Sequence, residues 1–230
     1  MVDLACGSGA TLRAVSSRLP GRQRWRLVDN DIDLLVRVSS AQTAGEHVTT
    51  CHVDIANGIE VVLSEPVDLV TTSALLDLVS WNWLDRLAKQ CVSRGLLFYV
   101  ALTYDGRVTF EPADVFDAEI VEAVNRHQRR DKGFGPALGP TAGEEAIARF
   151  ITLGYAVDSG TADWALGCED EQIQRELLAG WAASARETGD LNLAEIQAWL
   201  GRRRRHIASR RSSIRVGHVD FFARPSIGTR

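Results

Sequence analysis

The sequence predicts a single α/β domain built on a doubly wound, mostly parallel sheet of seven strands. Short apolar runs alternate with segments whose apolar residues recur at helical spacing, which is the order of elements in such a fold. Each of the first runs ends in a glycine turn or a polar residue, as strands do at the carboxyl edge of such a sheet. The predicted Rossmann-like domain spans residues 1–225, and residues 226–230 are expected to form a loose tail.

The first strand and its turn are predicted from residues 2–11. A short apolar run, residues 2–4, leads into the turn Cys6-Gly7-Ser8-Gly9, and apolar residues from Leu12 onward then recur at helical spacing. Glycine permits positive φ and lets a ligand lie against bare main chain. The pattern predicts a nucleotide site at the start of a helix, although the same spacing also occurs in plain tight turns.

Three further apolar runs end in polar residues and extend the predicted sheet. Residues 25–28 end in Asp29, Asn30 and Asp31; residues 47–53 end in Asp54 and Ile55; residues 67–71 end in Thr72 and Ser73. A carboxylate at the tip of the second strand, about twenty residues after a glycine turn, can accept hydrogen bonds from both hydroxyls of a ribose. These strand ends therefore predict one nucleotide-binding edge.

The first two motifs resemble those of class I S-adenosylmethionine-dependent methyltransferases. The first motif of that family reads roughly D-L-G-C-G-T-G, and this chain has Asp3-Leu4-Ala5-Cys6-Gly7-Ser8-Gly9, with Ala5 in place of the first glycine. The resemblance continues through Asp77 and Leu78 into a strand over residues 96–104, and it covers the first half of the chain. Residues 216–225 suit the antiparallel last strand of that fold.

The resemblance implies methyl transfer from S-adenosylmethionine to a small-molecule acceptor. The implied cofactor-binding residues are Asp3, Ala5, Gly7, Gly9, Asp29, Asn30, Asp54, Ile55 and Ser73. The segment from Asp3 to Gly9 would hold the methionine part of the cofactor and Asp29 the ribose hydroxyls. Asp54 with Ile55 would hold the adenine, and Ser73 would lie near the transferable methyl group.

Two other functions compete with this interpretation. A nicotinamide-dependent dehydrogenase needs a third glycine in G-x-G-x-x-G, where this chain has Leu12, and its motif gives no role to Asp54. A non-catalytic adenosylmethionine-binding or partner-dependent subunit is the second alternative. The first motif starts at residue 3, so either the true start lies upstream or the covering helices usual in this family are missing. The second alternative function is favoured if they are missing. The uncovered apolar surface would then favour a homodimer.

Composition agrees with a cytoplasmic enzyme. The 230 residues suffice for one sizeable core, and the net charge of −4 with a pI near 5.8 gives no general attraction to nucleic acid or to an anionic membrane. The four cysteines form no C-x-x-C pair, which argues against a metal knuckle or a disulfide framework. No run of eighteen apolar residues predicts a membrane span. We therefore expect no metal, nucleic-acid or membrane partner.

The second half of the chain departs from the minimal fold. Residues 104–107 predict a turn, or a hairpin into residues 108–110, and helices are predicted over residues 115–129 and 142–153. A sixth strand within residues 155–166 is followed by two inserted helices, near 169–187 and 193–210. The arginines from Arg202 to Arg205 lie at the end of the second of these helices. They favour a structural role there, because positive charge suits a helix C-terminus and no aromatic residues are interleaved.

Three residues are candidates for contact with the acceptor. Asp77 follows the fourth strand, where the resembled family often places substrate-facing residues; a plain carboxylate at a helix start is the equal alternative. Residues 127–140 combine charged side chains with three glycines and two prolines, which predicts an ordered loop or lid rather than a helix. On this loop His127, which titrates near neutrality, and Asp131 are the candidates. A solvated connector with a surface histidine is the alternative, and His218 is expected to be structural.

Overall fold

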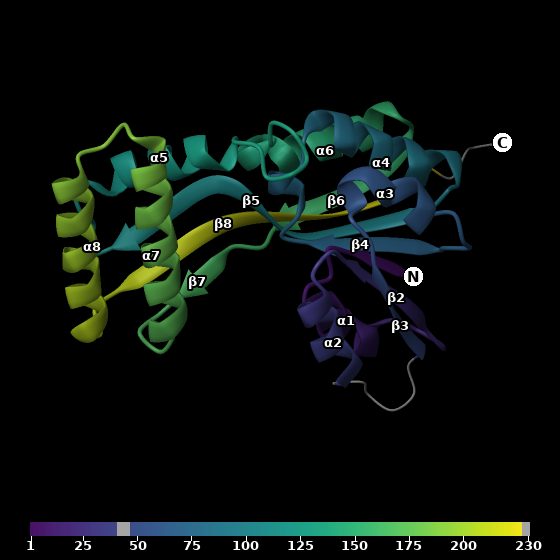
Figure 1. The fold of residues 1–230 in the computed structure, drawn as a ribbon, viewed down its shortest axis with the longest axis horizontal. Helices are drawn as coiled ribbons and strands as arrows, with labels where there is room; N and C mark the ends of the chain where they lie inside the picture. Colours follow the sequence, from purple (N-terminus) through teal and green to yellow (C-terminus); the bar gives the residue numbers. More distant parts are fainter. Residues whose placement is uncertain (41–46, 227–230) are drawn as a thin grey trace.

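The computed structural model describes residues 1–40 and 47–226, and its centre is one eight-stranded sheet (Figure 1). The sheet order is β3-β2-β1-β4-β5-β8-β6, with β7 paired to β8. Strands β1 to β5 are parallel, and β8 runs antiparallel to its three neighbours. The strands are β1 (Val2–Leu4), β2 (Arg24–Asp29), β3 (His47–His52), β4 (Leu69–Ser73), β5 (Leu97–Glu111), β6 (Tyr155–Thr161), β7 (Trp164–Leu166) and β8 (Ser213–Pro225).

The predicted α/β class and the mostly parallel sheet are confirmed. The strand count differs by one, because the single sixth strand predicted within residues 155–166 is two strands, β6 and β7, separated at residues 162–163. Both pair with β8, β7 with its first half and β6 with its second half. The tail predicted over residues 226–230 lies outside the described residues from position 227 onward.

Eight helices and three short 3₁₀ turns connect the described strands. The helices are α1 (Ala10–Val15), α2 (Ile32–Ser40), α3 (Ile55–Val62), α4 (Trp81–Ser93), α5 (Asp117–Gln128), α6 (Ala142–Thr152), α7 (Glu171–Thr188) and α8 (Leu193–Ala208), and the 3₁₀ turns are Ser16–Arg18, Leu76–Leu78 and Gly139–Thr141. Several begin at capping side chains: Ser80 accepts a hydrogen bond from the Trp83 amide, and Asn192 accepts one from the Ala194 amide.

Helices cover both faces of the parallel part of the sheet. Successive residues of β2 point to opposite faces, so that Val28 packs with α3, α4 and α6 while Leu27 packs with α1 and α2. The larger core contains Phe98, Phe150 and Phe221, whose rings contact one another across β5, α6 and β8. Figure 1 shows α3, α4 and α6 on one side of the strands and α1 and α2 on the other.

Strands β5 and β8 are much longer than strands β1 to β4 and carry a second lobe. They run on beyond the parallel sheet, with β7 on the far side of β8, and helices α5, α7 and α8 pack around this ribbon (Figure 1). The helices α7 and α8 fall between β7 and β8 in the chain. This lobe has its own apolar core, which includes Phe110, Leu178 and Trp199.

The turn predicted at residues 104–107 is wrong: β5 continues through it. The pairing of β5 with β8 shifts in register between Val100 and Thr103 and again between Tyr104 and Val108, so the extra residues form irregularities in the strand instead of a hairpin. Gly106 lies there with φ +86°, and a Cβ atom on it would come within 2.9 Å of Pro140. The glycine therefore allows the loop before α6 to pack against the strand.

Candidate functional site

The register of the sheet brings the predicted strand ends to one level. Leu4 of β1 pairs with Val28 of β2 on one side and with Thr72 of β4 on the other. The residues that follow them, Ala5, Asp29 and Ser73, therefore emerge together at the carboxyl edge. Strand β3 joins the same edge, because its last residue, His52, pairs with Asp29.

The glycine loop after β1 presents bare main chain to open space. Its residues Ala5, Gly7 and Gly9 have φ values of +50°, +54° and +80°. A Cβ atom placed on Gly7 would meet no heavy atom within 4 Å, whereas one on Gly9 would lie 3.4 Å from Val38 of α2. Gly7 thus leaves room for a ligand against the backbone, and Gly9 permits close packing of the loop on α2.

Asp29 connects the tip of β2 to this loop. The Gly7 amide donates a hydrogen bond to Oδ2 of Asp29 at 2.8 Å, and the Asp31 amide donates one to Oδ1 at 3.0 Å. These bonds fix the carboxylate, which is 8% exposed, while each oxygen retains capacity for a further donor. The neighbouring Asn30 is exposed, and its carbonyl oxygen lies 3.1 Å from Nε2 of His52.

Asp54 and Ile55 begin helix α3 at the end of β3. The exposed carboxylate of Asp54 caps the helix, since it accepts hydrogen bonds at 2.9 Å from the Ala56 amide and from the side chain of Asn57. Ile55 is buried, and its carbonyl oxygen accepts a hydrogen bond of 2.8 Å from the Trp83 indole. Both positions are therefore held in place by α3 and α4.

Asp3 lies beneath the glycine loop and is fully buried within β1. The hydroxyl of Thr71 donates a hydrogen bond of 2.7 Å to its Oδ1, and Oδ2 has no hydrogen-bond partner among the described residues. Burial raises the pKa of this carboxyl from 3.8 to about 7, although the nearby hydroxyls of Thr71 and Thr11 act to lower it. The group is therefore poised between its neutral and charged forms near neutral pH.

Backbone strain is concentrated around this edge. Four non-glycine residues in the described part of the chain have positive φ, and three of them, Ala5, Ala74 and Leu102, lie at the ends or irregularities of β1, β4 and β5. An L-residue in this region costs of order 1–3 kcal/mol and persists where surrounding structure imposes it, commonly at functional sites. The amide of Ala74 also bonds to the carbonyl of Ala101, which holds the two strained segments together.

A cavity of about 200 Å³ begins at these two strained segments and runs between the parallel sheet and the second lobe. Ala74 and Leu102 lie on its wall. Its polar and aromatic lining residues come from six elements far apart in the chain: Asp77, Tyr104, Gln128, Trp164, Trp181 and His218. Because Ala74 directly follows Ser73, the cavity adjoins the carboxyl edge of β4.

Asp77 and His218 are the ionisable groups of this cavity besides Tyr104. Asp77 is 5% exposed, burial raises its pKa to about 6, and its Oδ2 lies 3.5 Å from the side-chain amide of Gln128. His218 is 7% exposed, burial lowers its pKa, and its Nδ1 has no hydrogen-bond partner among the described residues. The rings of Trp164 and Tyr104 lie 5.1 and 6.3 Å from the imidazole.

The other two predicted substrate residues lie outside the lining of this cavity. His127 Nε2 is 2.8 Å from Glu187 of α7, and its Nδ1 is 3.3 Å from Nζ of Lys132. Asp131 is exposed and accepts hydrogen bonds from the amides of Gly133 and Gly135 at 2.7 and 3.0 Å. Their contact with an acceptor stays a prediction.

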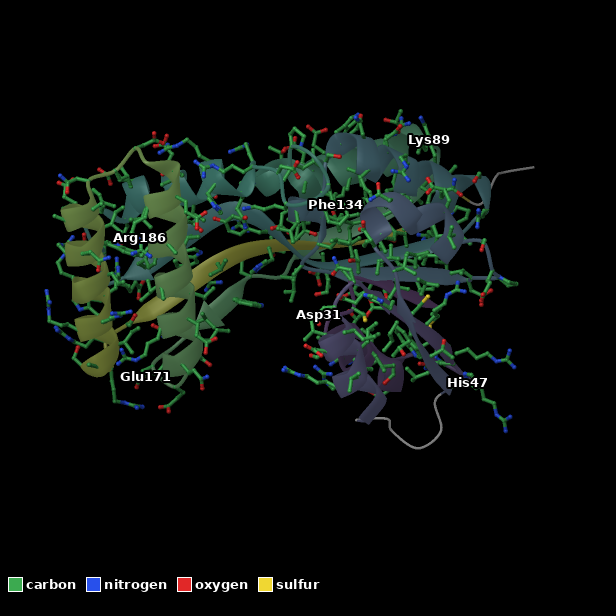
Figure 2. All side chains as sticks on the ribbon, in the orientation of Figure 1. Asp31, His47, Lys89, Phe134, Glu171 and Arg186 are labelled. Carbon is green, nitrogen blue, oxygen red and sulfur yellow. The ribbon has the colours of Figure 1, made fainter. Side chains whose placement is uncertain are left out.

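The 127–140 loop is ordered and packed on α4. Phe134, labelled in Figure 2, meets the ring of Trp83 edge-on at a centroid distance of 5.4 Å. The Leu138 amide donates a hydrogen bond of 2.8 Å to the Val79 carbonyl, and Ala137 forms an isolated bridge with Ser80. The segment after Gln128 is therefore structured and not an open connector. The prediction that His127 lies on this loop is wrong, because α5 continues to Gln128 and holds His127 in its last turn.

Sequence reasoning missed most of the cavity. It assigned His218 a structural role and did not single out Tyr104, Trp164 or Trp181. Gln128 carried a usable signal, since it lies within the helix predicted over residues 115–129, four residues after the buried Val124. The aromatic residues carried none, because only the crossing of β5, β7, α7 and β8 brings them together.

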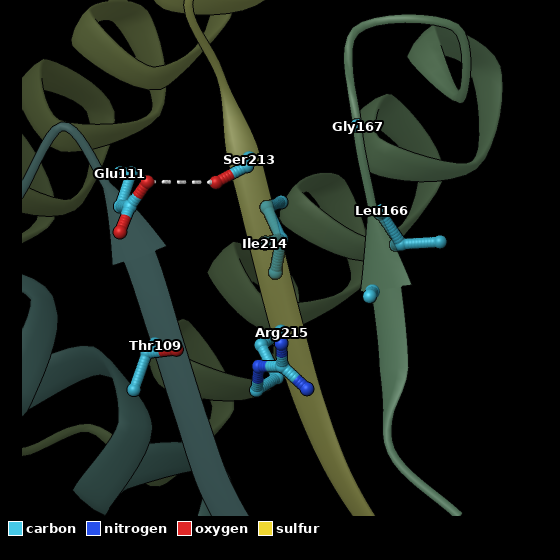
Figure 3. Close-up of a pocket in the computed structure, with 8 residues that line it drawn as sticks. Thr109, Glu111, Leu166, Gly167, Ser213, Ile214 and Arg215 are labelled. Atoms are coloured by element: carbon cyan, nitrogen blue, oxygen red, sulfur yellow. Dashed lines mark hydrogen bonds between the residues drawn. The ribbon is translucent and has the colours of Figure 1, made fainter.

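A second cavity, of about 260 Å³, lies at the far end of the β5–β8–β7 ribbon (Figure 3). Thr109, Glu111 and Arg215 line it, and Ser213 donates a hydrogen bond of 3.4 Å to Glu111. The cavity is remote in the sheet from the glycine loop, since it involves the last residues of β5 and the first of β8. We assign it no part in the site.

No helix within residues 1–40 and 47–226 has the length and apolar character needed to cross a bilayer. Nor do these residues contain a group of three or more His, Cys, Asp or Glu side chains arranged to hold a metal ion.

No protein-family model matches the chain, and no curated protein matches its sequence. Solved structures do match its fold. A cyclopropane-fatty-acyl-phospholipid synthase-like protein from Lactobacillus casei aligns with a TM-score of 0.61 and 10% identity, over 96% of this chain and 82% of that one. The YcgJ protein from Bacillus subtilis aligns with a TM-score of 0.54 and 13% identity, over 99% and 92% of the two chains.

A third structure is that of the mycolic acid cyclopropane synthase CmaA1 complexed with SAH and CTAB, with a TM-score of 0.50 and 10% identity over 97% of this chain and 76% of that one. The chain has the class I methyltransferase fold. Within this fold the glycine loop, Asp29 and Asp54 occupy the carboxyl ends of β1, β2 and β3, as the sequence motifs predicted. At these identities the likeness concerns the fold alone.

Proposed function

We propose that the protein is a methyltransferase that uses S-adenosylmethionine and methylates a small molecule. The observation that carries this proposal is the hydrogen bond from the Gly7 amide to Asp29. It joins a glycine loop with bare, open main chain to a fixed carboxylate at the tip of the next strand. A ribose against this carboxylate would meet acceptors for both of its hydroxyls.

The residues of this edge fit S-adenosylmethionine. Open space faces Gly7, and Asp29 has unused acceptor capacity in a nearly buried position. Asp54 and Ile55 stand at the adjoining strand end, where the adenine would lie. When bound, the cofactor supplies a methyl group already activated by a positively charged sulfur.

The task left to the chain is then to position the acceptor. The cavity that adjoins Ala74 and Leu102 is walled by both lobes and offers few polar groups, so it can orient a small molecule and exclude water. Holding two reactants in attack geometry can lower a barrier by roughly 7–11 kcal/mol. This cavity favours a catalyst over a subunit that only binds the cofactor.

The first test is the affinity of an Asp29→Ala variant for S-adenosylmethionine. We expect binding to weaken by roughly 1–3 kcal/mol, because the variant loses charge-assisted hydrogen bonds and also releases the Gly7 amide. Isothermal titration calorimetry on the purified protein measures it. Asp33→Ala, an exposed carboxylate in the first turn of α2, is the matched control and should bind as the parent does. Unchanged affinity in Asp29→Ala would remove this residue from the site, and tighter binding of NAD would overturn the class.

The 127–140 loop gives a second test. The double variant His127→Ala, Asp131→Ala removes the pair with Glu187 and the acceptor that organises Gly133 and Gly135. We expect nearly normal affinity for S-adenosylmethionine and slower methyl transfer to the eventual acceptor, because loops of this kind close and complete sites. Full turnover would leave the loop as structural packing on α4.

A further inference from the structure

The lining of the 200 Å³ cavity carries one strong negative group and no positive one. Among its described lining residues there is no lysine or arginine, and the side chain of Asp77 is the single carboxylate. The other walls are aliphatic or aromatic, with Tyr104, Trp164 and Trp181 supplying three ring systems. A buried carboxylate in such surroundings is costly unless a cation accompanies it.

Asp77 has no cationic partner within the described residues. The side-chain amide of Gln128 donates to its Oδ2 at 3.5 Å, and an amide leaves the negative charge uncompensated. With a pKa of about 6, the group is still mainly ionised at neutral pH. The folded chain therefore retains a buried negative charge directly beside the strained end of β4.

His218 does not supply the missing positive charge. Burial lowers its pKa and keeps the imidazole neutral at pH 7. The charged groups that act on it are further carboxylates, Asp105, Asp163 and Asp220. Arg107 pairs with the first two of these outside the cavity lining. Arg215 also pairs with Asp163. The negative charge of the cavity lining is therefore that of Asp77.

We propose that the methyl acceptor is a small primary or secondary amine, which enters this cavity as an ammonium ion, pairs with Asp77 and lies against the aromatic walls. The inference rests on the proposed methyl transfer and specifies its acceptor. A compact cation beside indole and phenol rings is stabilised by their π systems, and the effect is larger where water is excluded. The ammonium also neutralises Asp77, for which the lining of the cavity supplies no cation.

The same groups suit the chemistry of an amine. An ammonium nitrogen has no lone pair, so one N–H bond must break first, with the proton passing to a carboxylate oxygen of Asp77. The freed lone pair forms the new C–N bond to the methyl carbon as the C–S bond breaks, and the electrons of that bond stay on sulfur. The positive charge moves from sulfur to the methylated nitrogen, where Asp77, after losing its proton to water, can again pair with it.

Other acceptor classes fit less well. A carboxylate or phosphate would meet Asp77 without a cation to balance either charge, which costs several kcal/mol for a desolvated like-charge pair. A neutral alcohol or phenol would be tolerated, but it leaves the charge of Asp77 unpaired. An amine acceptor therefore predicts that, among small molecules of one shape, the cavity binds the cationic one most tightly.

The test uses three probes of one shape and different charge: benzylamine, benzyl alcohol and benzoate. Binding to the full chain is measured at pH 7 by saturation-transfer NMR and by quenching of tryptophan fluorescence, each with and without S-adenosylhomocysteine. We expect benzylamine to bind at least about tenfold more tightly than benzyl alcohol, and benzoate not to bind. This comparison needs no variant. Equal binding of amine and alcohol, or preference for benzoate, overturns the amine assignment.

Two variants locate the binding. Asp77→Asn should lower benzylamine affinity about tenfold or more while leaving benzyl alcohol affinity unchanged, and Glu119→Gln, an exposed acid on α5, is the matched control. Trp181→Leu should lower amine affinity while circular dichroism stays native. An amine that binds Asp77→Asn and the parent chain equally well is elsewhere on the protein and counts against the proposal.

The outcomes also separate this inference from the function it rests on. If S-adenosylhomocysteine binds but the amine does not, the methyltransferase proposal stands and the amine acceptor is wrong. If the amine binds through Asp77 but neither S-adenosylmethionine nor its demethylated product binds, the cavity is a cation site and the acceptor role is wrong.

Discussion

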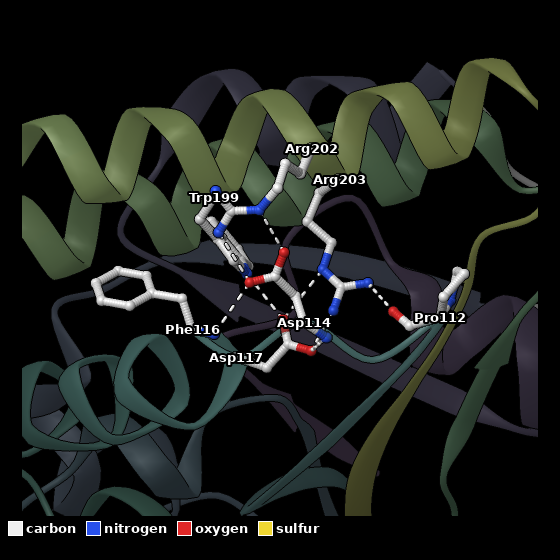
Figure 4. Close-up of polar contacts among 7 residues, drawn as sticks. All are labelled: Pro112, Asp114, Phe116, Asp117, Trp199, Arg202 and Arg203. Atoms are coloured by element: carbon white, nitrogen blue, oxygen red, sulfur yellow. Dashed lines mark hydrogen bonds and ion pairs between the residues drawn. The ribbon is translucent and has the colours of Figure 1, made fainter.

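Replacing Asp117 by alanine is expected to destabilise the protein by about 3–5 kcal/mol, because it leaves a buried guanidinium without its counter-ion. Arg203 of α8 is 0% exposed and forms an ion pair with Asp117 at the start of α5 (Figure 4). It also donates a 2.6 Å hydrogen bond to the Pro112 carbonyl and lies 4.4 Å above the ring of Phe110. The Trp199 indole donates to the same carboxylate at 2.8 Å. The variant therefore leaves two buried donors, Arg203 and Trp199, without this acceptor.

Urea denaturation followed by circular dichroism measures this loss. The matched control is Glu122→Ala on the same helix, which removes an exposed pair with Arg126 and should cost less than about 1 kcal/mol. The neighbouring ion pair of Arg202 with Asp114 is intermediate in burial between these two pairs. Arg202 lowers the pKa of Asp114 to about 2. Similar midpoints for Asp117→Ala and Glu122→Ala would mean that the pair contributes no more than a surface contact.

Local sequence patterns were enough to predict the parallel half of the fold. The run ending in Asp29, the glycine turn and the cap at Asp54 each depend on residues within a few positions of one another. A parallel sheet then places their ends at one edge whatever the connecting helices are, because every strand runs the same way. For this reason the positions of Asp29, Asp54 and Ser73 at one edge could be predicted from the sequence, while their contact with a cofactor stays a prediction.

The second lobe depends on contacts between distant segments. Residues 104–107 look like a turn because they contain Asp105 and Gly106, yet pairing with β8 more than a hundred residues later holds them in a strand. The arginines of α8 were judged by their helix end alone, whereas their partners Asp114 and Asp117 precede them by more than eighty residues. Nothing in the local pattern specifies either contact.

The 200 Å³ cavity could not be predicted for the same reason. Its lining comes from the segment after β4 and from β5, α5, β7, α7 and β8, and each residue is ordinary in its own segment. Asp77 could be singled out because it follows β4, but its isolation from any cation is a property of the assembled walls. The assignment of His218 as structural followed from its strand pattern, which does not show that Nδ1 lacks a partner.

The buried carboxyl of Asp3 is expected to make the protein less stable as the pH rises from about 4 to 8. The pKa is 3.8 in the unfolded chain and about 7 in the folded one, so between these values the unfolded state has lost a proton that the folded state keeps. The free energy of unfolding then falls with pH, by about 4 kcal/mol in total once both states are ionised. Below about pH 4 both states are protonated, so this carboxyl no longer makes the free energy of unfolding depend on pH.

Asp3→Asn isolates this effect, because the amide oxygen can still accept from Thr71 while the side chain no longer titrates. We expect the difference in unfolding free energy between variant and parent to shift in favour of the variant from pH 5 to pH 8, as measured by urea titrations at each pH. The buried Asp77, with a pKa raised to about 6, acts in the same direction in both proteins and cancels. Because Oδ2 of Asp3 has no partner among the described residues, the substitution also changes the unfolding free energy by an amount that does not depend on pH. Only the change of the difference with pH therefore tests the prediction.

The exposed Asp33→Asn serves as the control, and its unfolding free energy should vary with pH as that of the parent does. A constant difference between Asp3→Asn and the parent across this range would show that Asp3 is ionised in the folded chain, in which case the charge beneath the glycine loop is permanent.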